Sequence, residues 1–269
     1  MQTSSEMPKR PGLIPGFDAA KLPWWAILLV LAGLAISTLI ITNGNYNDTF
    51  LFLKDGVITT LRITFFSFII ATTLGLITGL SRVSKNPILF NISTLYVETV
   101  RGIPLVVLLL YIAFALVPLF IDTLAALNIT LSIRDVPMEA RAIVALAIGY
   151  GAYEGEVFRA GIQSIGRGQM EAARALGLSY FQAMRFVILP QAVRRVLPPL
   201  GNDFISLLKD SSLATVLAVD ELTQLGRIRR ASTFRVLETF NVVAFLYLAM
   251  TLLLSSAVRW LEERLKIAE

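Results

Sequence analysis

Long blocks of apolar residues constrain this chain more than any other feature of its sequence. A helix needs about 20 mostly apolar residues to cross the hydrocarbon core of a bilayer. Six stretches of the chain meet or approach this requirement: residues 24–42, 57–80, 88–120, 141–165, 197–219 and 240–260. The third stretch is too long for one straight helix, and it is interrupted by Glu98, Arg101, Gly102 and Pro104. The sequence therefore predicts an all-α integral membrane protein with six spans.

The composition agrees with a membrane protein and excludes several kinds of chemistry. Only 16% of the 269 residues are charged, whereas soluble domains average about 25%. The chain has no histidine and no cysteine, so it lacks the usual ligands of zinc and haem, the partners of a disulfide and the histidine-based nucleophile pairs. We therefore expect neither a metal site nor covalent catalysis.

Lysine and arginine indicate the orientation of the spans, because they concentrate in cytoplasmic loops. Basic residues are dense in the tail 1–23, at 82–85 and at 167–195, and they are sparse in the loops 43–55 and 121–138. This alternation predicts six spans with both termini in the cytoplasm. The net charge of +5 follows from this topology, so nucleic acid is not an expected partner.

One predicted outer loop breaks this pattern. It lies between the fifth and sixth spans and contains Arg227, Arg229, Arg230 and Arg235. Either a span is miscounted, or these arginines face a partner outside the cytoplasm. Because the other five loops agree with six spans, we favour an extracytoplasmic partner that docks on Arg227, Arg229 and Arg230.

The predicted cytoplasmic segment between the fourth and fifth spans, about 166–195, is polar and rich in helix-forming residues. Its first half ends in Gly177, and glycine is preferred in the left-handed position that follows a helix. Ser179 then begins a second helix, and Gln182 completes a capping box. That helix is expected to stop near Pro190, because the residue before proline avoids the helical region. The two short helices either rest on the membrane surface as an amphipathic hairpin or bind a partner.

This segment resembles the EAA loop of ABC-importer permeases. The matching residues are Glu171, Ala172, Ala173, Gly177, Leu189 and Pro190, with Val187 where the family has isoleucine. Four more stretches are similar to the polar amino acid permeases of the histidine, glutamine and glutamate type, namely 101–105, 152–156, 161–165 and 209–213. The resemblance covers residues 56–265 and implies a MetI-like core of five helices. Residues 24–42 then form one extra N-terminal transmembrane helix.

The resemblance implies that the EAA loop docks into a groove of a cytoplasmic ATPase, with Glu171, Ala172 and Gly177 at the matching positions. The chain has no G-x-x-x-x-G-K-[ST] motif, and its nearest lookalike, at 161–168, lacks the Lys and the Ser or Thr. ATP and Mg²⁺ are therefore expected on a dimer of partner ATPases, with no cofactor in this chain. A second permease, identical or related, and an extracytoplasmic solute-binding protein complete the importer expected in the bacterial cytoplasmic membrane.

Polar residues inside the predicted spans are functional candidates, because charge in the bilayer core is costly. They are Glu98, Arg101, Glu154, Glu156, Asn202, Asp203, Lys209 and Asp210. The alternative is structural pairing, with Glu98 bonded to Arg101 and Lys209 neutralised by a neighbouring aspartate.

A transported amino acid needs a carboxylate beside its ammonium group and donors beside its own carboxylate. Asp203 or Glu156 is the candidate for the first role. The candidates for the second role are Asn202, Arg101 and Arg62.

Two G-x-x-x-G pairs, Gly75 with Gly79 and Gly151 with Gly155, lie on the second and fourth spans. Small residues at this spacing let helices approach closely. We expect packing within the fold, and contact between two copies is the alternative.

The alternative function is an ion-coupled secondary amino acid transporter, which needs no ATPase. Such transporters often contain inverted repeats, and we find none in this sequence. A membrane scaffold without transport is a third alternative, which the density of polar residues in the fifth span disfavours. Which amino acids are carried does not follow from the sequence.

Overall fold

The computed structural model describes residues 24–265, and within this range the chain forms helices and turns without a strand. The tail 1–23, predicted to be cytoplasmic, and residues 266–269 lie outside the described residues. The α-helices of the described range are α1 (Trp24–Thr42), α2 (Gly44–Val83), α3 (Pro87–Gly102), α4 (Leu105–Tyr111), α5 (Val117–Ala126), α6 (Met138–Gln163), α7 (Arg167–Ala175), α8 (Tyr180–Ala183), α9 (Leu189–Asp210), α10 (Leu222–Thr233) and α11 (Val236–Leu265). Between them lie two π turns, Ile112–Leu116 and Met184–Ile188, and two 3₁₀ turns, Ile133–Asp135 and Ser211–Leu217.

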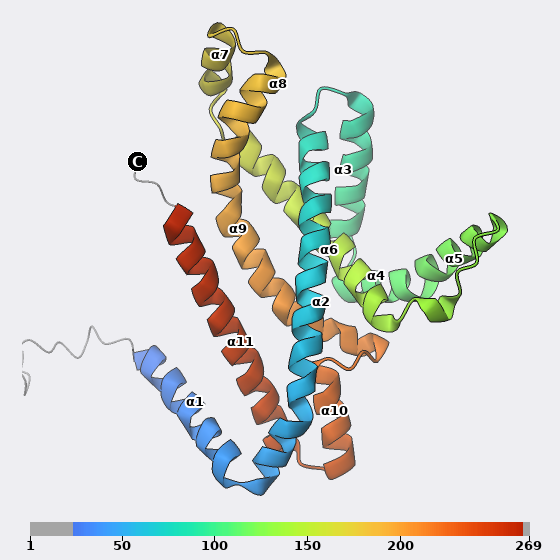
Figure 1. Cartoon of the computed structure of the whole chain (residues 1–269), viewed down its shortest axis with the longest axis vertical. Helices are drawn as coiled ribbons and strands as arrows, with labels where there is room; N and C mark the ends of the chain where they lie inside the picture. Colours follow the sequence, from blue (N-terminus) through green and yellow to red (C-terminus); the bar gives the residue numbers. More distant parts are fainter. Residues whose placement is uncertain (1–23, 266–269) are drawn as a thin grey trace, which may run out of the picture.

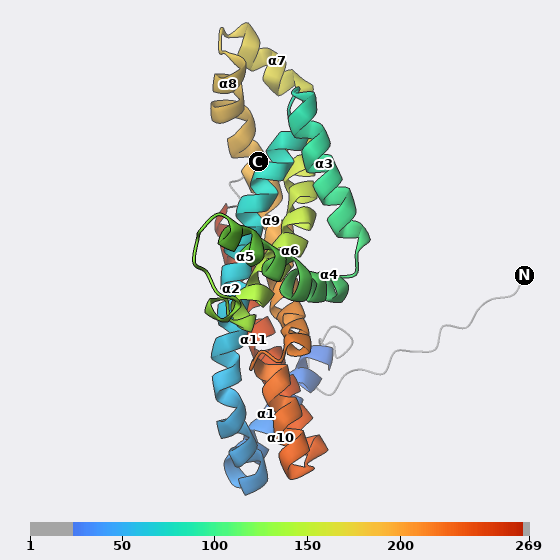
Figure 2. The ribbon, with the colours of Figure 1, turned by 90° about the vertical axis from the view of Figure 1, so that its right-hand side faces the viewer.

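Most of the long helices run roughly along one long axis, whereas α4 and α5 extend sideways near its middle (Figures 1 and 2). The turn between α2 and α3 lies at the same end as α7 and α8, which we call the α7–α8 end. The turn between α1 and α2 lies with α10 at the opposite end, the α10 end. The basic segments 82–85 and 167–195 thus share one end of the molecule, as the predicted alternation requires.

Four helical stretches of the described residues are long and apolar enough to cross a membrane: Trp24–Thr42, Gly44–Val83, Leu105–Ala126 and Val236–Arg264. The first has the bounds expected for the first span. Helices α6 and α9, with 26 and 22 residues, are also long enough, but their charged residues are spaced so that neither contains an apolar stretch of span length. The predicted third span is instead two helical stretches: α3, of 16 residues, ends at Gly102, and α4 begins after Pro104 and turns away toward α5 (Figure 1).

The second span is longer than predicted. Residues 44–55, expected as an outer loop, form the first turns of α2, which Asn43 caps by accepting a hydrogen bond from the Asn45 N–H. Lys54 and Asp55 end the apolar stretch in the sequence, but both are exposed, while Leu53 is buried. The expectation of a loop is wrong because the buried face of this helix continues through the charged residues.

The helix expected to stop near Pro190 does not stop there. A proline ring clashes with the carbonyl four residues earlier in an α-helix. The π turn Met184–Ile188 widens the helix before the proline, and the Leu189 N–H donates to the carbonyl of Met184, five residues back. Because of this adjustment α8 runs through the π turn into α9. The predicted fifth span, 197–219, is therefore displaced: α9 begins at Leu189, and a 3₁₀ turn follows it from Ser211.

The two G-x-x-x-G pairs face each other where α2 crosses α6. A Cβ added to Gly79 would lie 2.5 Å from the Cβ of Phe158, and one added to Gly151 would lie 3.0 Å from the Cβ of Leu74. The Ser67 hydroxyl donates to the Ile143 carbonyl across the same crossing, at 3.2 Å. These glycines therefore serve packing within the fold, as expected.

Candidate functional site

The turn between α7 and α8 has a fixed backbone geometry. Gly177 adopts a φ of 87°, in the left-handed region that favours glycine. Its N–H donates to the Arg174 carbonyl at 3.0 Å, and the Leu178 N–H donates to the Ala173 carbonyl at 3.2 Å. These two bonds form a Schellman motif, so the predicted left-handed position of Gly177 after the first short helix is confirmed.

The capping box that begins the second short helix is also present. The Gln182 N–H donates to the Ser179 hydroxyl at 3.2 Å, and the Ser179 N–H donates to the Gln182 side-chain oxygen at 2.8 Å. Backbone groups at the end of α7 and at the start of α8 therefore have hydrogen-bond partners. We call the hairpin formed by α7 and α8 the coupling hairpin, after the role that the resemblance to the EAA loop implies.

The coupling hairpin is attached to the two long helices on either side of it. Ala173 is buried, and the apolar cluster beneath the hairpin includes Ile162 of α6 and Ala192 of α9. Arg195 of α9 donates to the carbonyl of Ser164 at 2.5 Å. A displacement of the hairpin is therefore transmitted to α6 and α9 together.

The six residues predicted to couple to an ATPase are not equally accessible. Glu171, Ala172, Gly177 and Pro190 are exposed, whereas Leu189 is half-buried and Ala173 belongs to the buried side. Of the six, Ala173 is therefore the residue that a partner cannot contact directly.

The sequence analysis missed an apolar surface on the coupling hairpin. Leu176 is 84% exposed, Phe181 71% and Phe186 63%, and Tyr180 is also exposed. Large apolar side chains gathered on a surface indicate an interaction site. The available signal was the position of these residues immediately beside Gly177 and the capping box.

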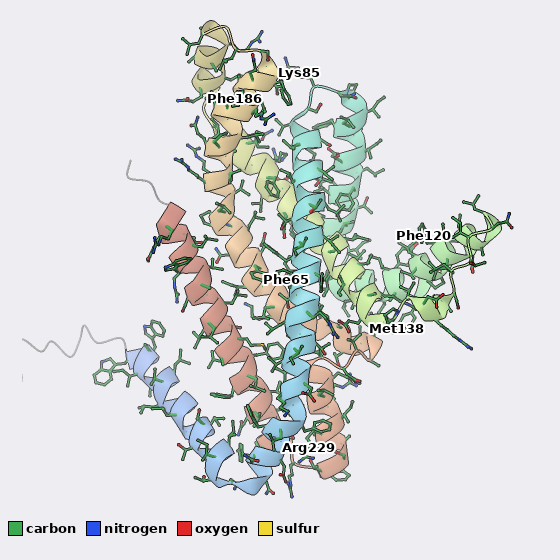
Figure 3. All side chains as sticks on the ribbon, in the orientation of Figure 1. Phe65, Lys85, Phe120, Met138, Phe186 and Arg229 are labelled. Atoms are coloured by element: carbon green, nitrogen blue, oxygen red, sulfur yellow. The ribbon has the colours of Figure 1, made fainter. Side chains whose placement is uncertain are left out.

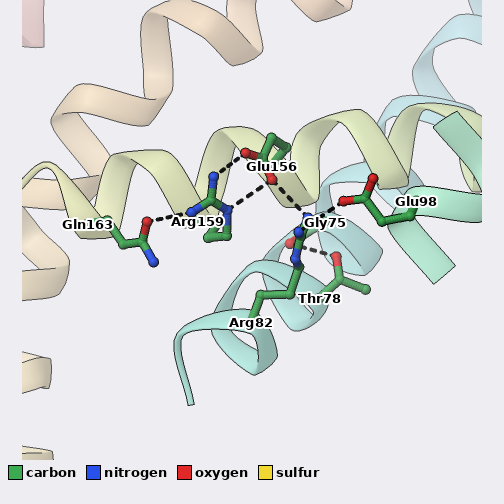
Figure 4. Close-up of polar contacts among 7 residues, drawn as sticks. All are labelled: Gly75, Thr78, Arg82, Glu98, Glu156, Arg159 and Gln163. Atoms are coloured by element: carbon green, nitrogen blue, oxygen red, sulfur yellow. Dashed lines mark hydrogen bonds and ion pairs between the residues drawn. The ribbon is translucent and has the colours of Figure 1, made fainter. Parts of the chain in front are cut away.

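A group of charged side chains joins α2, α3 and α6 (Figure 4). Arg82 donates to Glu156 at 2.8 Å and to Glu98 at 3.2 Å. Arg159 pairs with Glu156 as well and donates to Gln163. Glu156, a predicted substrate ligand, thus has its charge balanced by two arginines.

The predicted pairing of Glu98 with Arg101 is wrong. Glu98 bonds to Arg82 instead, and the guanidinium of Arg101 lies over the ring of Tyr153, 5.4 Å from its centre. The i,i+3 spacing on one helix suggested the pair, but the neighbouring helices offer both side chains other partners. Arg62, the other basic candidate, makes two hydrogen bonds to Glu139 at 2.5 and 2.6 Å.

Asp203 lies beside an acidic residue that the sequence analysis did not select as a ligand. Glu154 is completely buried, and neither of its carboxylate oxygens has a hydrogen-bond partner among the described residues. Asp203 interacts electrostatically with Glu154, and its own Oδ2 is buried without a partner in the same range. Thr72 of α2 also lies close to Glu154. Glu154, two residues before the predicted Glu156, is the carboxylate that the fold brings close to Asp203.

The remaining polar residues of α9 point elsewhere. Asn202 and Lys209 are exposed, and within residues 24–265 no carboxylate pairs with Lys209, contrary to the pairing considered above. Asp210 accepts a hydrogen bond from the Tyr150 hydroxyl at 2.7 Å. The four predicted substrate ligands, Asp203, Asn202, Glu156 and Arg101, are therefore not brought into a single cluster.

The arginines of the predicted outer loop lie on α10. Arg227 and Arg230 are exposed and share a shallow depression of about 220 Å³ with Gln224. Arg229 instead turns toward α2, where its guanidinium lies 5.6 Å from the ring centre of Phe52. Glu221 fixes the start of the helix by accepting hydrogen bonds from the Thr223 and Gln224 N–H groups, both at 2.8 Å. Only Arg227 and Arg230 form an outward basic surface.

Several long apolar helices, joined by turns at both ends of the molecule, define a multi-pass membrane protein. Residues 71–267 match the family model described as "Binding-protein-dependent transport system inner membrane component". The chain belongs to this family, and it is an ABC transporter permease.

Named relatives agree with this assignment. The chain is 40% identical over 225 residues to the probable glutamine ABC transporter permease protein GlnP of Bacillus subtilis (strain 168), covering 82% of this chain and 97% of that protein. It is 42% identical over 194 residues to the glutamine transport system permease protein GlnP of Escherichia coli (strain K12), covering 72% and 84%. An ion-coupled secondary transporter is not favoured by these relatives.

Solved structures show the same fold. The crystal structure of an amino acid ABC transporter with histidines has a chain that is 36% identical, with a TM-score of 0.67, covering 81% of this chain and 95% of that chain. An inward-facing structure of the MetNI methionine ABC transporter matches with a TM-score of 0.66 at 23% identity, over 81% and 97% of the two chains. The predicted all-α, MetI-like fold is confirmed.

Proposed function

We propose that this chain is the permease subunit of an ATP-driven importer that carries polar amino acids across a bacterial cytoplasmic membrane. The observation that carries this proposal is the coupling hairpin, a capped and braced structure that presents Glu171 and an apolar surface at one end of the molecule. The amino acid cargo is supported by the names of the bacterial relatives, two of which are glutamine permeases.

In this proposal the coupling hairpin docks on a cytoplasmic ATPase that holds ATP and Mg²⁺. The small side chain of Ala172 permits close approach, and Glu171 accepts charge-assisted hydrogen bonds that fix the orientation. Phe181 and Leu176 supply apolar contact area. Because the hairpin is joined to α6 and α9, closure of two ATPases moves these helices in each of two paired permeases.

The α7–α8 end is cytoplasmic in this arrangement, in agreement with the distribution of basic residues. The α10 end then faces a solute-binding protein. Arg227 and Arg230 attract acidic side chains on that protein, because complementary charge steers and orients association.

For the translocated amino acid, we propose that Asp203 receives the ammonium group. It is a half-buried carboxylate whose Oδ2 lacks a hydrogen-bond partner in the described range. Glu156 and Arg101 are engaged with other side chains, and the exposed Asn202 remains a candidate donor on the same helix.

The test is co-expression of the permease with candidate ATPase and solute-binding subunits, purification of the complex, and ATPase assays in nanodiscs. We expect ATP hydrolysis to rise when the binding protein is loaded with its amino acid. Asp203→Asn should reduce transport while leaving complex assembly intact. Uptake that proceeds without the ATPase and follows an ion gradient contradicts the proposal.

A further inference from the structure

A polar cavity lies at the α7–α8 end, on the flank of the coupling hairpin. Its volume is about 440 Å³, within the range of roughly 300–1,000 Å³ common for ligand pockets. The turn between α2 and α3 contributes Ser84, Lys85 and Asn86, and the hairpin contributes Arg174 and Tyr180. Figure 3 shows Lys85 between that turn and α8. The cavity is thus formed by two parts of the chain that are far apart in the sequence.

The cavity offers positive charge without a counter-ion. Lys85 and Arg174 are both exposed, and within residues 24–265 neither pairs with a carboxylate. Arg174 donates one hydrogen bond, to the Leu178 carbonyl at 3.0 Å, which leaves most of its N–H donors available. Asn86 already accepts a hydrogen bond from the Ile88 N–H at 2.9 Å. The chemistry that fits is an anion with several oxygen atoms.

An apolar surface begins directly beside this cavity. In the first turn of α3, Ile88 is 66% exposed, Leu89 47% and Phe90 42%. In a membrane protein such residues contact acyl chains, so the cavity lies at the level of the lipid head groups. Tyr180 fits that level, since tyrosine is enriched at membrane interfaces. A soluble anion or an acidic protein side chain explains the charge but not the adjoining apolar surface.

We propose that this cavity binds the phosphate head group of an anionic phospholipid, with its acyl chains along the exposed side of α3. Lys85 and Arg174 pair with the phosphate, as basic pockets at the cytoplasmic face of membranes do. The bound lipid joins the α2–α3 turn to α7 and braces the coupling hairpin from the side. This inference depends on the membrane location of the chain and not on the proposed cargo.

The test uses the full-length permease in nanodiscs of phosphatidylcholine with or without phosphatidylglycerol, with lipid retention counted by native mass spectrometry. The variant Lys85→Gln/Arg174→Gln removes both charges from the cavity. The matched control, Arg185→Gln/Arg194→Gln, removes two exposed charges from the same end of the molecule. Each basic residue near an anionic lipid strengthens binding by about five-fold in affinity. We therefore expect the cavity variant, which lacks two such residues, to bind phosphatidylglycerol roughly 25-fold more weakly. The control should bind as the unmodified chain does.

Three results would overturn the proposal. The first is equal phosphatidylglycerol retention by the cavity variant and the control. The second is displacement of the lipid by millimolar inorganic phosphate or glycerol 3-phosphate, which identifies a site for free phosphate. The third is unchanged lipid retention with weaker ATPase binding, which assigns the cavity to the protein interface.

Discussion

Gly75 of α2 and Glu154 of α6 are packed in direct contact: a Cβ added to Gly75 would lie 2.7 Å from the Cβ of Glu154. The glycine allows the two helices to cross closely, and the close crossing seals the Glu154 side chain away from solvent. One relationship therefore accounts both for a close helix crossing and for a carboxylate that is buried without a hydrogen-bond partner among the described residues.

The crossing of α2 and α6 should not tolerate added volume. In Gly79→Ala the new Cβ would lie 2.5 Å from the Cβ of Phe158 and 2.9 Å from the Gly155 carbonyl. Overpacking of this kind costs about 1–3 kcal/mol, so we expect Tm in detergent to fall by several degrees. The control is Gly33→Ala on α1, which has open space around it. It should keep or raise Tm because alanine favours helix, and an equal loss in both variants would contradict the packing argument.

Two glutamates separated by one residue on α6 should respond in opposite ways to the same change. Glu154 is buried without a hydrogen-bond partner among the described residues, so Glu154→Gln replaces an unpartnered carboxyl group with an amide of similar size and should leave Tm unchanged or raise it. Glu156 pairs with Arg82 and Arg159, so Glu156→Gln leaves Arg159 without a carboxylate partner and Arg82 with Glu98 alone. We expect the free energy of unfolding of the Glu156→Gln variant to fall by about 1–3 kcal/mol. This is less than for a fully buried ion pair, because these side chains are partly exposed. Thermal unfolding at neutral pH compares them, and a larger loss in Glu154→Gln would show that its charge is required.

The sequence predicted the parts of this structure that depend on local chemistry. The turn at Gly177 and the capping box at Ser179 follow from the properties of a few adjacent residues, and both are present. The predicted end of the helix near Pro190 failed because a π turn accommodates the proline ring, and this turn packs against α6 in the apolar cluster beneath the hairpin. The pairing of Glu98 failed for a related reason, since Arg82 comes from another helix and only tertiary structure brings it close. Glu154 was named among the polar residues inside the spans but, unlike Asp203, was not selected as a substrate ligand, because the proximity of the two arises from the packing of α6 against α9.

The left-handed turn of the coupling hairpin gives a prediction that separates backbone strain from side-chain contact. Gly177→Ala places a Cβ on a residue with a φ of 87° and nothing within 4 Å, so only the backbone conformation is penalised, by about 1 kcal/mol. We expect a distorted hairpin and a several-fold loss of ATPase stimulation in the assembled complex. Gly168→Ala, also in open space but within α7, should keep normal stimulation. Equal stimulation in both variants would show that the turn geometry is not needed for coupling.

The two outward arginines of α10 should control association with the solute-binding protein. Arg227→Glu/Arg230→Glu reverses the charge of the depression that they share, while Glu221 keeps the helix start intact. Reversal of charge at an electrostatically steered interface slows association and weakens binding, here by about ten-fold or more at low salt. The effect should shrink in 0.5 M salt because exposed charges are screened.

The matched control for this experiment is Lys54→Glu/Arg134→Glu, which makes the same change of charge at two exposed positions in the segments predicted as the other outer loops. Surface plasmon resonance with the permease in nanodiscs measures the affinity of the loaded binding protein. If only the α10 variant binds weakly, the basic surface of α10 is the docking site. Equal weakening in both variants would instead reflect the overall charge of that side of the protein, and unchanged affinity in the α10 variant would exclude Arg227 and Arg230 from the interface.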